Sequence, residues 1–459
     1  MTISLEKRSA EAKVDEGLFQ SFQEITTSLK EFYSYLTIPS DKKQEVVASW
    51  DHEKSPSLRA ELTEADTQHL MNALAGLVKM QAELPKDEDP VHVLYGWKLD
   101  ETIAQIGMVL SSANGNMEHF HKQNYEIYGA PDEVLYRAAL DWVCNDAEII
   151  LTDEDATEEQ KTAAQEVVNQ LTPMRGYREL LSPESEVFDK IRQDHYREGG
   201  YYALLLDGVS QPDDVVTEEQ GDLILEHVLR NNVGSNYAYE KRKGGSWGVS
   251  HSTEKVYGPE AYNYSWERFV GLPLGHEIGT HLAEKQNALS GPLLLASVGL
   301  DRFERGTEGR AVIREQVPYD SFDEFGKLIR WRDILRRHIA ISYAEGVDED
   351  ERPEHHEVYE FMKKIDYMYI LKDSDSADGA PDKARERTST LLLRVLKGTD
   401  GKGAYLKDKV YLEGNVAAWL SAALRGASAI SEADKAKYDI NNSRHLLELI
   451  KLGVIDSNA

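Results

Sequence analysis

The sequence predicts an α+β fold that is predominantly helical, and three observations support this class. Apolar residues recur at spacings of three and four through much of the chain, which is the period of an amphipathic helix. One short block, residues 246–258, contains β-branched and aromatic residues near glycines, the pattern of short strands joined by a turn. The length of 459 residues allows a large core, and the single cysteine, Cys144, excludes an intrachain disulfide.

The first half of the chain is expected to be mainly helical. The clearest segments are LFQSFQEITTSLKEFYSYL at 18–36 and TQHLMNALAGLVKMQAEL at 67–84. Further helices are expected at residues 99–112, 132–150 and 158–171. The acidic stretch 152–160 is expected to be a loop leading into the last of these, because carboxylates near a helix start interact favourably with the helix dipole.

Glycine and proline breaks between residues 197 and 220 indicate a domain boundary. A mainly helical segment is expected from Ser265, after the short strands. Beyond 346 the chain is acidic, then helical, loop-like at 372–387 and helical again in SRHLLELIKLGVI. The sequence therefore predicts a helical N-terminal region, a core that carries the site and a helical C-terminal region that completes it, at residues 1–205, 206–345 and 346–459.

The charge balance restricts the partners of the chain. The formal net charge is −29, from 81 acidic and 52 basic side chains, which makes a nucleic-acid backbone or an anionic membrane an unfavourable partner. An acidic peptide would also be repelled unless a local group of basic residues compensates. The longest apolar segment, GPLLLASVGL at 291–300, is too short to span a bilayer, and no signal peptide is recognised, so a cytoplasmic protein is expected.

The string GHEIGTH at 275–281 carries the chemistry. His276 and Glu277 are adjacent, and His281 follows five positions after His276. In an ideal α-helix, residues five apart point about 140° from each other, whereas the common zinc motif spaces its histidines four apart, about 40°. A π-type turn would restore a shared face, and Gly279 is a suitable place for it. We therefore predict a π-bulge across His276 to His281; the alternative is two partly buried histidines that bond locally.

A catalytic zinc takes three protein ligands and leaves a position for water, so a third ligand must come from elsewhere. Glu308, in RGTEGRAVIRE, is the best candidate, because 308 − 281 = 27 residues allow the chain to reverse and present a second helix. Glu304 and Glu315 compete for the role. In the expected chemistry zinc activates a water molecule, and Glu277 takes its proton and returns it to the leaving amine.

These residues resemble a known family. HEIGTH at 276–281, followed by GLDRFERGTEGRA at 299–311, looks like the tyrosine/phenylalanine carboxypeptidase domain family, which includes microtubule-associated tyrosine carboxypeptidases and bacterial proteins named for a QEGLA motif. The segments at 128–139 and 405–416 are similar to the flanking blocks of that family.

The resemblance implies that His276, His281 and Glu308 bind Zn²⁺ and that Glu277 is catalytic. It also implies a zincin-like core with a bulged HExxxH helix, flanked by helical regions. The expected activity is a metallocarboxypeptidase that removes a C-terminal tyrosine or phenylalanine from a peptide or protein.

Three residues depart from the pattern of the family. Arg310 stands where the family usually has leucine and would bring a cation near the metal. Thr307 replaces an acidic or amide residue beside the proposed ligand, so a contact that supports it is expected to be lost. Pro273 is expected to kink or start the helix three residues before His276.

A carboxypeptidase must bind the terminal carboxylate of its substrate, and an arginine fork suits this task. The substrate-binding candidates are Arg310, Arg314, Arg394 and Lys407. The arginines of LIRWRDILRRH are instead interpreted as a basic helix face that packs against acidic segments: Arg330, Arg332, Arg336 and Arg337. His251 is interpreted as structural, with a donor role at the site as the alternative, and His355 and His356 are placed in a surface loop without a role.

Two rival functions remain open. One is an amino- or dipeptidyl-peptidase, since the five-residue histidine spacing also resembles that of dipeptidyl peptidase III. The other is a regulatory or binding protein that retains the fold, with or without zinc, and has no turnover.

Overall fold

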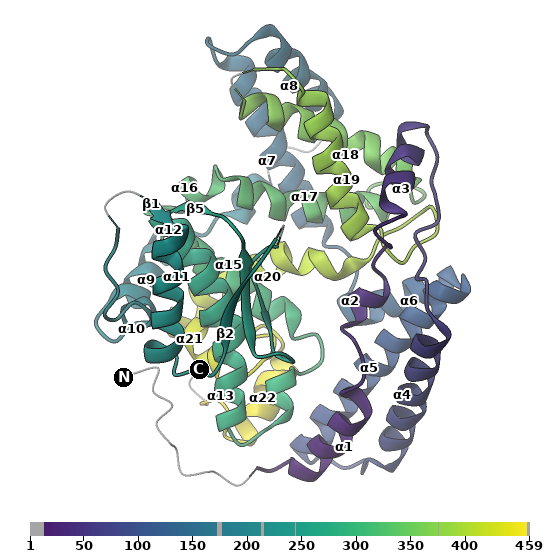
Figure 1. Cartoon of the computed structure of the whole chain (residues 1–459), viewed down its shortest axis with the longest axis vertical. Coiled ribbons are helices and arrows are strands. Elements are labelled where there is room, and N and C mark those ends of the chain that lie inside the picture. The colour runs from purple at the N-terminus through teal and green to yellow at the C-terminus, as the bar shows by residue number, and fades with distance from the viewer. Residues whose placement is uncertain (1–12, 172–176, 213–214, 244, 375, 457–459) are drawn as a thin grey trace.

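The structure is a computed structural model that describes residues 13–171, 177–212, 215–243, 245–374 and 376–456. Within these ranges the chain is predominantly helical and contains two small sheets (Figure 1). The predicted α+β, mostly helical class is therefore confirmed at this level.

The N-terminal part begins with a series of helices. They are α1 (Glu16–Thr26), α2 (Phe32–Tyr35), α3 (Lys43–Asp51), α4 (Glu64–Glu83), α5 (Pro90–Asn114), α6 (Met117–Tyr128), α7 (Glu133–Thr152) and α8 (Glu158–Leu171). The helices predicted at 67–84, 132–150 and 158–171 are confirmed, and the one at 99–112 lies inside the longer α5. The single helix predicted at 18–36 is wrong, because Thr26 and Thr27 donate their hydroxyls to the last carbonyls of α1 and the helix ends there.

The middle of the chain carries shorter helices around the candidate site. They are a 3₁₀ turn (Arg178–Leu181), α9 (Ser185–Tyr196), α10 (Tyr201–Leu205), α11 (Glu218–His227), a π-turn (Val228–Asn232), α12 (Trp266–Phe269), a π-helix (Val270–Leu282), α13 (Ala283–Ser290), α14 (Leu295–Val298), α15 (Glu304–Gln316), α16 (Phe322–Gly326) and α17 (Ile329–Ala344). We call the π-helix Val270–Leu282 the motif helix, because it contains HEIGTH. Ser265 caps α12 by accepting a hydrogen bond from the Arg268 amide, so the helical segment starts where the sequence predicts.

The C-terminal part is helical to its end. Its elements are α18 (His355–Lys372), α19 (Ala380–Val395), a 3₁₀ turn (Leu406–Lys409), α20 (Val410–Arg425), α21 (Ser428–Glu432), a second 3₁₀ turn (Ala433–Lys435) and α22 (Ser443–Lys451). The helix predicted in SRHLLELIKLGVI is confirmed as α22.

Two predictions for the C-terminal part are wrong. The loop expected at 372–387 ends early, because α19 begins at Ala380. Pro381 lies in its first turn, where the missing N–H costs no hydrogen bond. His355 and His356 open α18 instead of lying in a surface loop, and the His355 ring is buried against the Gly403 carbonyl and the Thr399 hydroxyl.

The strands form two separate small sheets. In the first, β1 (Val215–Thr217) pairs antiparallel with β5 (Asn263–Ser265). In the second, β4 (Lys255–Pro259) lies between β3 (Gly248–Ser250), which is antiparallel to it, and β2 (Ala238–Arg242), which is parallel. The strands predicted within 246–258 are confirmed as β3 and β4. Both pack against the motif helix and so cover one side of the candidate site.

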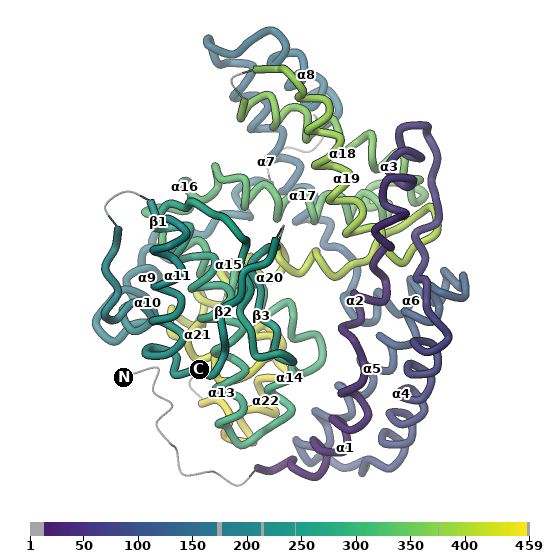
Figure 2. The backbone as a smooth tube through the Cα atoms, viewed as in Figure 1, coloured from purple at the N-terminus to yellow at the C-terminus, as the bar shows by residue number. Residues whose placement is uncertain are grey.

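Helices that are distant in the sequence pack on one another. α8 contacts α18, and α7 contacts α17 and α18, so segments of all three predicted regions share contacts at one end of the molecule (Figure 1). α15 lies side by side with α20 (Figure 2) and also packs on the motif helix. The boundaries 1–205, 206–345 and 346–459 stay a prediction. None of the described helices combines the length and apolar character that crossing a membrane requires.

Candidate metal centre

The motif helix has π geometry over its whole length. It continues directly from α12 and runs on into α13, so His276 and His281 lie within one uninterrupted helical segment. In a π-helix the hydrogen bond joins residues five apart, which places such residues on the same face. The two imidazole rings accordingly meet with their centroids 4.9 Å apart. The predicted π-turn across the histidines is confirmed, and it extends further than the sequence indicated.

Pro273 lies inside this helix, so it does not start the helix, and the kink that the sequence offered as the other effect stays a prediction. In an α-helix the proline ring clashes with the carbonyl four residues earlier. The wider π-turn relieves this clash, because its backbone follows a different hydrogen-bond register.

Glycines allow α15 to approach both the motif helix and α20. A Cβ at Gly271 would lie 2.9 Å from the Glu315 carbonyl oxygen, and one at Gly275 would lie 3.1 Å from the Arg314 carbonyl oxygen. On the opposite side of α15, a Cβ at Gly309 would overlap the backbone of Gly414 in α20. Since backbone atoms cannot move aside cheaply, any larger residue would push α15 away from the histidines.

α15 carries Glu308 to the two histidines. Glu308 Oε2 lies 3.5 Å from His276 Nε2 and 3.8 Å from His281 Nε2, and one possible ligand atom from each residue lies within 4.8 Å of the others. Two atoms that are each about 2.1 Å from a tetrahedral zinc ion lie about 3.4 Å apart. The three side chains predicted as ligands are therefore brought together at nearly the spacing that one zinc ion requires.

Glu308 Oε2 is buried and has no hydrogen-bond partner among the described residues. A buried carboxylate oxygen without a partner is costly, and two imidazole nitrogens that face it do not by themselves satisfy it. A cation held between the three groups would satisfy all of them. Burial also raises the pKa of Glu308 and keeps the pKa of His281 well below its usual value, whereas the pKa of His276 is raised, because Glu315, Glu277 and Glu308 outweigh the effect of burial there.

Glu315, which the sequence left as a rival of Glu308 for the third ligand position, contacts the other nitrogen of His276. Its Oε1 lies 2.6 Å from His276 Nδ1, which orients the ring and leaves Nε2 directed at Glu308. Arg330 holds the Glu315 carboxylate with two bonds, from Nε at 2.6 Å and from Nη2 at 2.5 Å. Glu304, the second rival, pairs with Lys407 at 2.6 Å. Glu315 lies seven residues after Glu308 on the same helix face, a spacing from which its position could have been found.

Glu277 lies beside the proposed ligands without joining them. Its Oε1 is 3.9 Å from His276 Nε2, and its side chain is buried. Burial, reinforced by the charges of Glu308 and Glu315, raises the pKa of Glu277 to about 7, although His276 opposes this. A carboxylate with such a pKa exchanges a proton readily near neutral pH, which suits a general base.

His251 follows β3 in a turn and contacts two other polar side chains. Its Nδ1 lies 3.0 Å from the Tyr237 hydroxyl and its Nε2 lies 3.1 Å from Lys437 Nζ. Burial and the nearby Lys437 lower the pKa of His251 to about 2, so the ring is neutral. Lys437 in turn contributes to the lowered pKa of His281, of which burial is the main cause. The structural interpretation of His251 fits these contacts.

Two of the predicted substrate-binding residues are occupied elsewhere. The Arg310 side chain is fully buried and pairs with Glu284, and Arg314 is fully buried and pairs with Asp434 at 2.5 Å. Arg314 also donates to the Gly279 carbonyl at 2.9 Å. These contacts correct the prediction that Arg310 and Arg314 bind the substrate, because neither guanidinium is accessible: Arg310 joins α15 to α13, and Arg314 joins α15 to the motif helix.

The other sequence expectations for this area have mixed outcomes. Arg394 pairs with Asp408, with Nη2 to Oδ1 at 3.1 Å, and its side chain is 45% exposed. Lys407 pairs with Glu304 and remains partly exposed, so both candidates lie near the surface with a carboxylate already bound.

Thr307 donates to Glu284 at 3.1 Å rather than supporting a ligand.

The arginines of α17 mostly follow the prediction of a basic face against acids. Arg330 pairs with Glu315, Arg332 with Asp373, and Arg336 with Asp333 and Asp366. Arg337 lies over the Tyr411 ring and makes no ion pair within 4 Å among the described residues, but Asp408 and Asp333 interact with it electrostatically.

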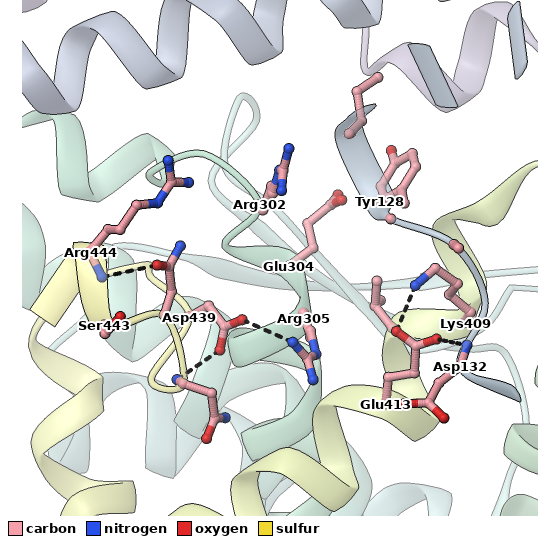
Figure 3. A pocket seen from close by; sticks show the side chains of 16 residues that line it. Tyr128, Asp132, Arg302, Glu304, Arg305, Lys409, Glu413, Asp439, Ser443 and Arg444 are labelled. Atoms are coloured by element: carbon pink, nitrogen blue, oxygen red, sulfur yellow. Dashed lines mark hydrogen bonds and ion pairs between the residues drawn. The ribbon is translucent and has the colours of Figure 1, made fainter. Parts of the chain in front are cut away.

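A pocket of about 640 Å³ opens beside the start of α15 (Figure 3). Glu304 and Arg305 line it, but the three proposed ligands and Glu277 do not. Its charged side chains largely pair with one another, as Lys409 does with Glu413 at 2.6 Å (Figure 3). The pocket is therefore separate from the metal centre.

Comparison of the chain with models of protein families, with curated proteins and with solved structures gave no match. The resemblance to a known family thus rests on the sequence motifs alone. The arrangement of two imidazoles, two carboxylates and an orienting acid can bind a divalent cation and exchange a proton beside it.

Proposed function

We propose that this chain is a zinc-dependent carboxypeptidase with a zincin-like core, in which His276, His281 and Glu308 hold Zn²⁺. The observation that carries the proposal is the buried, unpartnered Glu308 Oε2, which faces both histidine Nε2 atoms at 3.5 and 3.8 Å. Two nitrogens and one carboxylate oxygen are a donor set typical of catalytic zinc. When bound, zinc supplies a Lewis acid that lowers the pKa of water and polarises a carbonyl.

The residues of the chain have separate tasks in this proposal. Glu277, 3.9 Å from His276 Nε2, accepts the proton of the attacking water at its carboxylate and then donates it to the amine that leaves. Glu315 and Arg330 hold the His276 ring in the orientation that leaves Nε2 free. β3 and β4 pack against the motif helix on one side.

The choice of a carboxypeptidase rests on the resemblance of HEIGTH and TEGRA to the tyrosine/phenylalanine carboxypeptidase domain family. The proposed substrate is accordingly a peptide or protein that ends in tyrosine or phenylalanine. Amino- and dipeptidyl-peptidases use the same zinc chemistry but recognise a free amino end instead.

Two peptides that differ only in a free or an amidated C-terminus test this choice. We expect the zinc-loaded chain to release the last residue from the free acid and to leave the amide intact, as followed by mass spectrometry. Cleavage of both peptides from the amino end would identify an aminopeptidase or dipeptidyl-peptidase.

Glu277→Gln tests the catalytic role. The variant is expected to retain stoichiometric zinc and to lose about 10²- to 10⁴-fold in kcat, because the amide cannot accept the proton. If the wild-type chain binds zinc and cleaves none of a panel of peptides, the binding-protein alternative replaces the enzyme.

A further inference from the structure

Lys437 is a buried lysine whose amine has one polar partner among the described residues. The residue is 7% exposed, and its Nζ lies 3.1 Å from His251 Nε2, while no carboxylate in the described ranges comes within 4 Å of it. An ammonium group has three N–H donors, so two of them are left without an acceptor in this part of the chain. A buried cation with free donors favours binding of an anion from outside the chain.

The two acids that act electrostatically on Lys437 are both engaged elsewhere. Burial lowers the pKa of Lys437 to about 8, against the opposing charges of Glu284 and Glu308, so the amine stays largely protonated at neutral pH. Glu284 is neutralised by its ion pair with Arg310. Glu308 faces the two histidines of the metal centre and is a ligand in the proposed function. Neither acid therefore satisfies the free donors of Lys437.

The backbone beside Lys437 packs directly on α15 around the proposed ligand Glu308. A Cβ at Gly306, two residues before Glu308, would lie 2.5 Å from the carbonyl oxygen of Tyr438. Arg310, two residues after Glu308, donates from Nη1 to the same carbonyl at 3.4 Å. The residue that follows Lys437 is thus in contact with α15 both before and after the ligand.

The amine of Lys437 reaches a second element that packs on the motif helix. His251, its partner, directly follows β3, and both β3 and α15 pack on the motif helix. Lys437 therefore extends from α15 at its backbone to the turn after β3 at its Nζ, beside the helix that carries His281. Electrostatics agree with this position, since Glu308 acts on Lys437 and Lys437 acts on His281. Lys437 is thus adjacent to the metal centre.

A terminal carboxylate has to be bound close to the metal. The carbonyl that is attacked belongs to the residue before the last, and consecutive Cα atoms are about 3.8 Å apart. The cation that binds the carboxylate must therefore lie beside the ligands. Arg394 and Lys407, the partly exposed candidates from the sequence, already hold Asp408 and Glu304.

We propose that Lys437, held by His251, binds the terminal carboxylate of the substrate and thereby restricts cleavage to the C-terminal residue. The inference rests on the proposed function and names the specificity residue of the same site. His251 is a positioning residue here: its Nε2 accepts from Lys437, and its Nδ1 donates to the Tyr237 hydroxyl at 3.0 Å, which fixes the ring.

Turnover of a matched peptide pair tests the role of Lys437. For the zinc-loaded wild-type chain we expect a preference for the free acid over the C-terminal amide. Lys437→Met removes the donors, nearly keeps the length of the side chain and should reduce kcat/KM for the free acid about 10- to 100-fold, mainly through KM. Lys285→Met is the matched control, because Lys285 acts on both Lys437 and His251, and it should keep the wild-type preference.

The same pair of peptides tests the positioning role of His251. His251→Leu removes the acceptor and should weaken the acid preference about 3- to 10-fold through KM, whereas His251→Gln, which can still accept from Lys437, should restore it. A full preference in His251→Leu would overturn this positioning role.

Binding without turnover separates this inference from the proposed function. The probes are N-acetylphenylalanine and its amide, measured by calorimetry on zinc-loaded Glu277→Gln with and without Lys437→Met. Acid-selective binding that disappears with Lys437→Met supports the inference even if the wild-type chain cleaves no peptide, in which case the proposed function alone fails. Acid-selective binding that persists in Lys437→Met, or that is absent from Glu277→Gln itself, overturns the inference, and cleavage by the wild type would then leave the proposed function intact.

Circular dichroism and zinc content establish that each variant is folded. A crystal structure of zinc-loaded Glu277→Gln with N-acetylphenylalanine tests the inference with Lys437 unaltered, so it decides the matter even if Lys437→Met does not fold. The carboxylate of the probe is expected about 2.8 Å from Lys437 Nζ. A carboxylate bound to another cation would overturn the assignment.

Discussion

Of the places where the described core brings a histidine ring against a carboxylate, those at His445 and His276 differ in what they leave unsatisfied. His445 Nε2 lies 2.8 Å from Asp301 Oδ1, and its Nδ1 accepts a hydrogen bond from the Asp439 amide at 3.3 Å. Both ring nitrogens are therefore used within the fold. In the metal centre, Glu315 Oε1 lies 2.6 Å from His276 Nδ1, and Nε2 faces Oε2 of Glu308, which has no hydrogen-bond partner among the described residues.

The comparison shows that a buried histidine beside an acid is not by itself a metal site. At His445 each ring nitrogen has a partner, so the pair contributes structure and offers no ligand. At His276 one nitrogen is held and the other is left free, and the oxygen opposite is also left free. A buried histidine with a partner on one ring nitrogen and an unpartnered carboxylate oxygen opposite the other therefore indicates a metal site. Variants at each of the two places test this difference.

The largest expected difference concerns zinc itself. His276→Ala should abolish stoichiometric zinc, because two remaining ligands cannot form a catalytic zinc site. His445→Ala should retain zinc and instead lower the free energy of unfolding by about 1 to 3 kcal/mol, the cost of leaving Asp301 without its buried partner. Metal analysis after dialysis and denaturant unfolding measure the two effects. Loss of zinc from both variants would contradict the difference between the two places.

In the metal-free protein, the contributions of the two places to the free energy of unfolding should change with pH in opposite directions. The pKa of Glu277 is about 7 in the folded chain against 4.5 as its ordinary value, and burial is the main cause. The unfolded chain therefore loses this proton first, and stability falls as pH rises from about 4.5 to 7, by about 3 kcal/mol for this group. Glu277→Gln should remove that fall when unfolding is measured across this range.

Asp301 provides the matched control for this pH effect. His445 is the main group that lowers the pKa of Asp301, against the opposing effect of burial. Its contribution to stability is present above its ordinary value of 3.8 and is lost as pH falls through the lower folded pKa. Asp301→Asn should therefore alter the pH dependence of the free energy of unfolding only at acid pH. An altered pH dependence between pH 4.5 and 7 in this variant would contradict the opposite directions expected at the two places.

A smaller effect is expected from the residue that orients His276. Glu315→Gln keeps the size of the side chain and weakens its hold on His276 Nδ1, so zinc affinity should fall about 10- to 100-fold. Competition with a chelator measures this affinity. Asp301→Asn, which changes the pair formed by Asp301 and His445, should bind zinc as the wild type does. Unchanged affinity in Glu315→Gln would show that the contact does not support the ring.

The sequence predicted the local parts of the site well. The five-residue spacing of His276 and His281 requires a π-turn if both are to face one ion, and the structure has such a turn. The helical periodicity likewise placed α4, α7 and α8 within a few residues. These features depend on neighbours in the chain, which a sequence pattern records directly.

The contacts between distant segments could not be predicted in the same way. Arg310 and Arg314 were expected at the substrate, but Glu284 and Asp434, which neutralise them, are 26 and 120 residues away. Arg337 was interpreted as part of a basic face against acidic segments, and its contact with the Tyr411 ring is a tertiary contact that the spacing of α17 does not show. Which charge is paired depends on tertiary contacts rather than on spacing along a helix.

The position of zinc itself tests the central claim most directly. Crystals of the zinc-loaded chain, measured at the zinc absorption edge, should give one anomalous peak about 2.1 Å from His276 Nε2, His281 Nε2 and Glu308 Oε2. A peak at another place, or zinc-loaded crystals with no peak between these three atoms, would contradict the assignment of the metal centre.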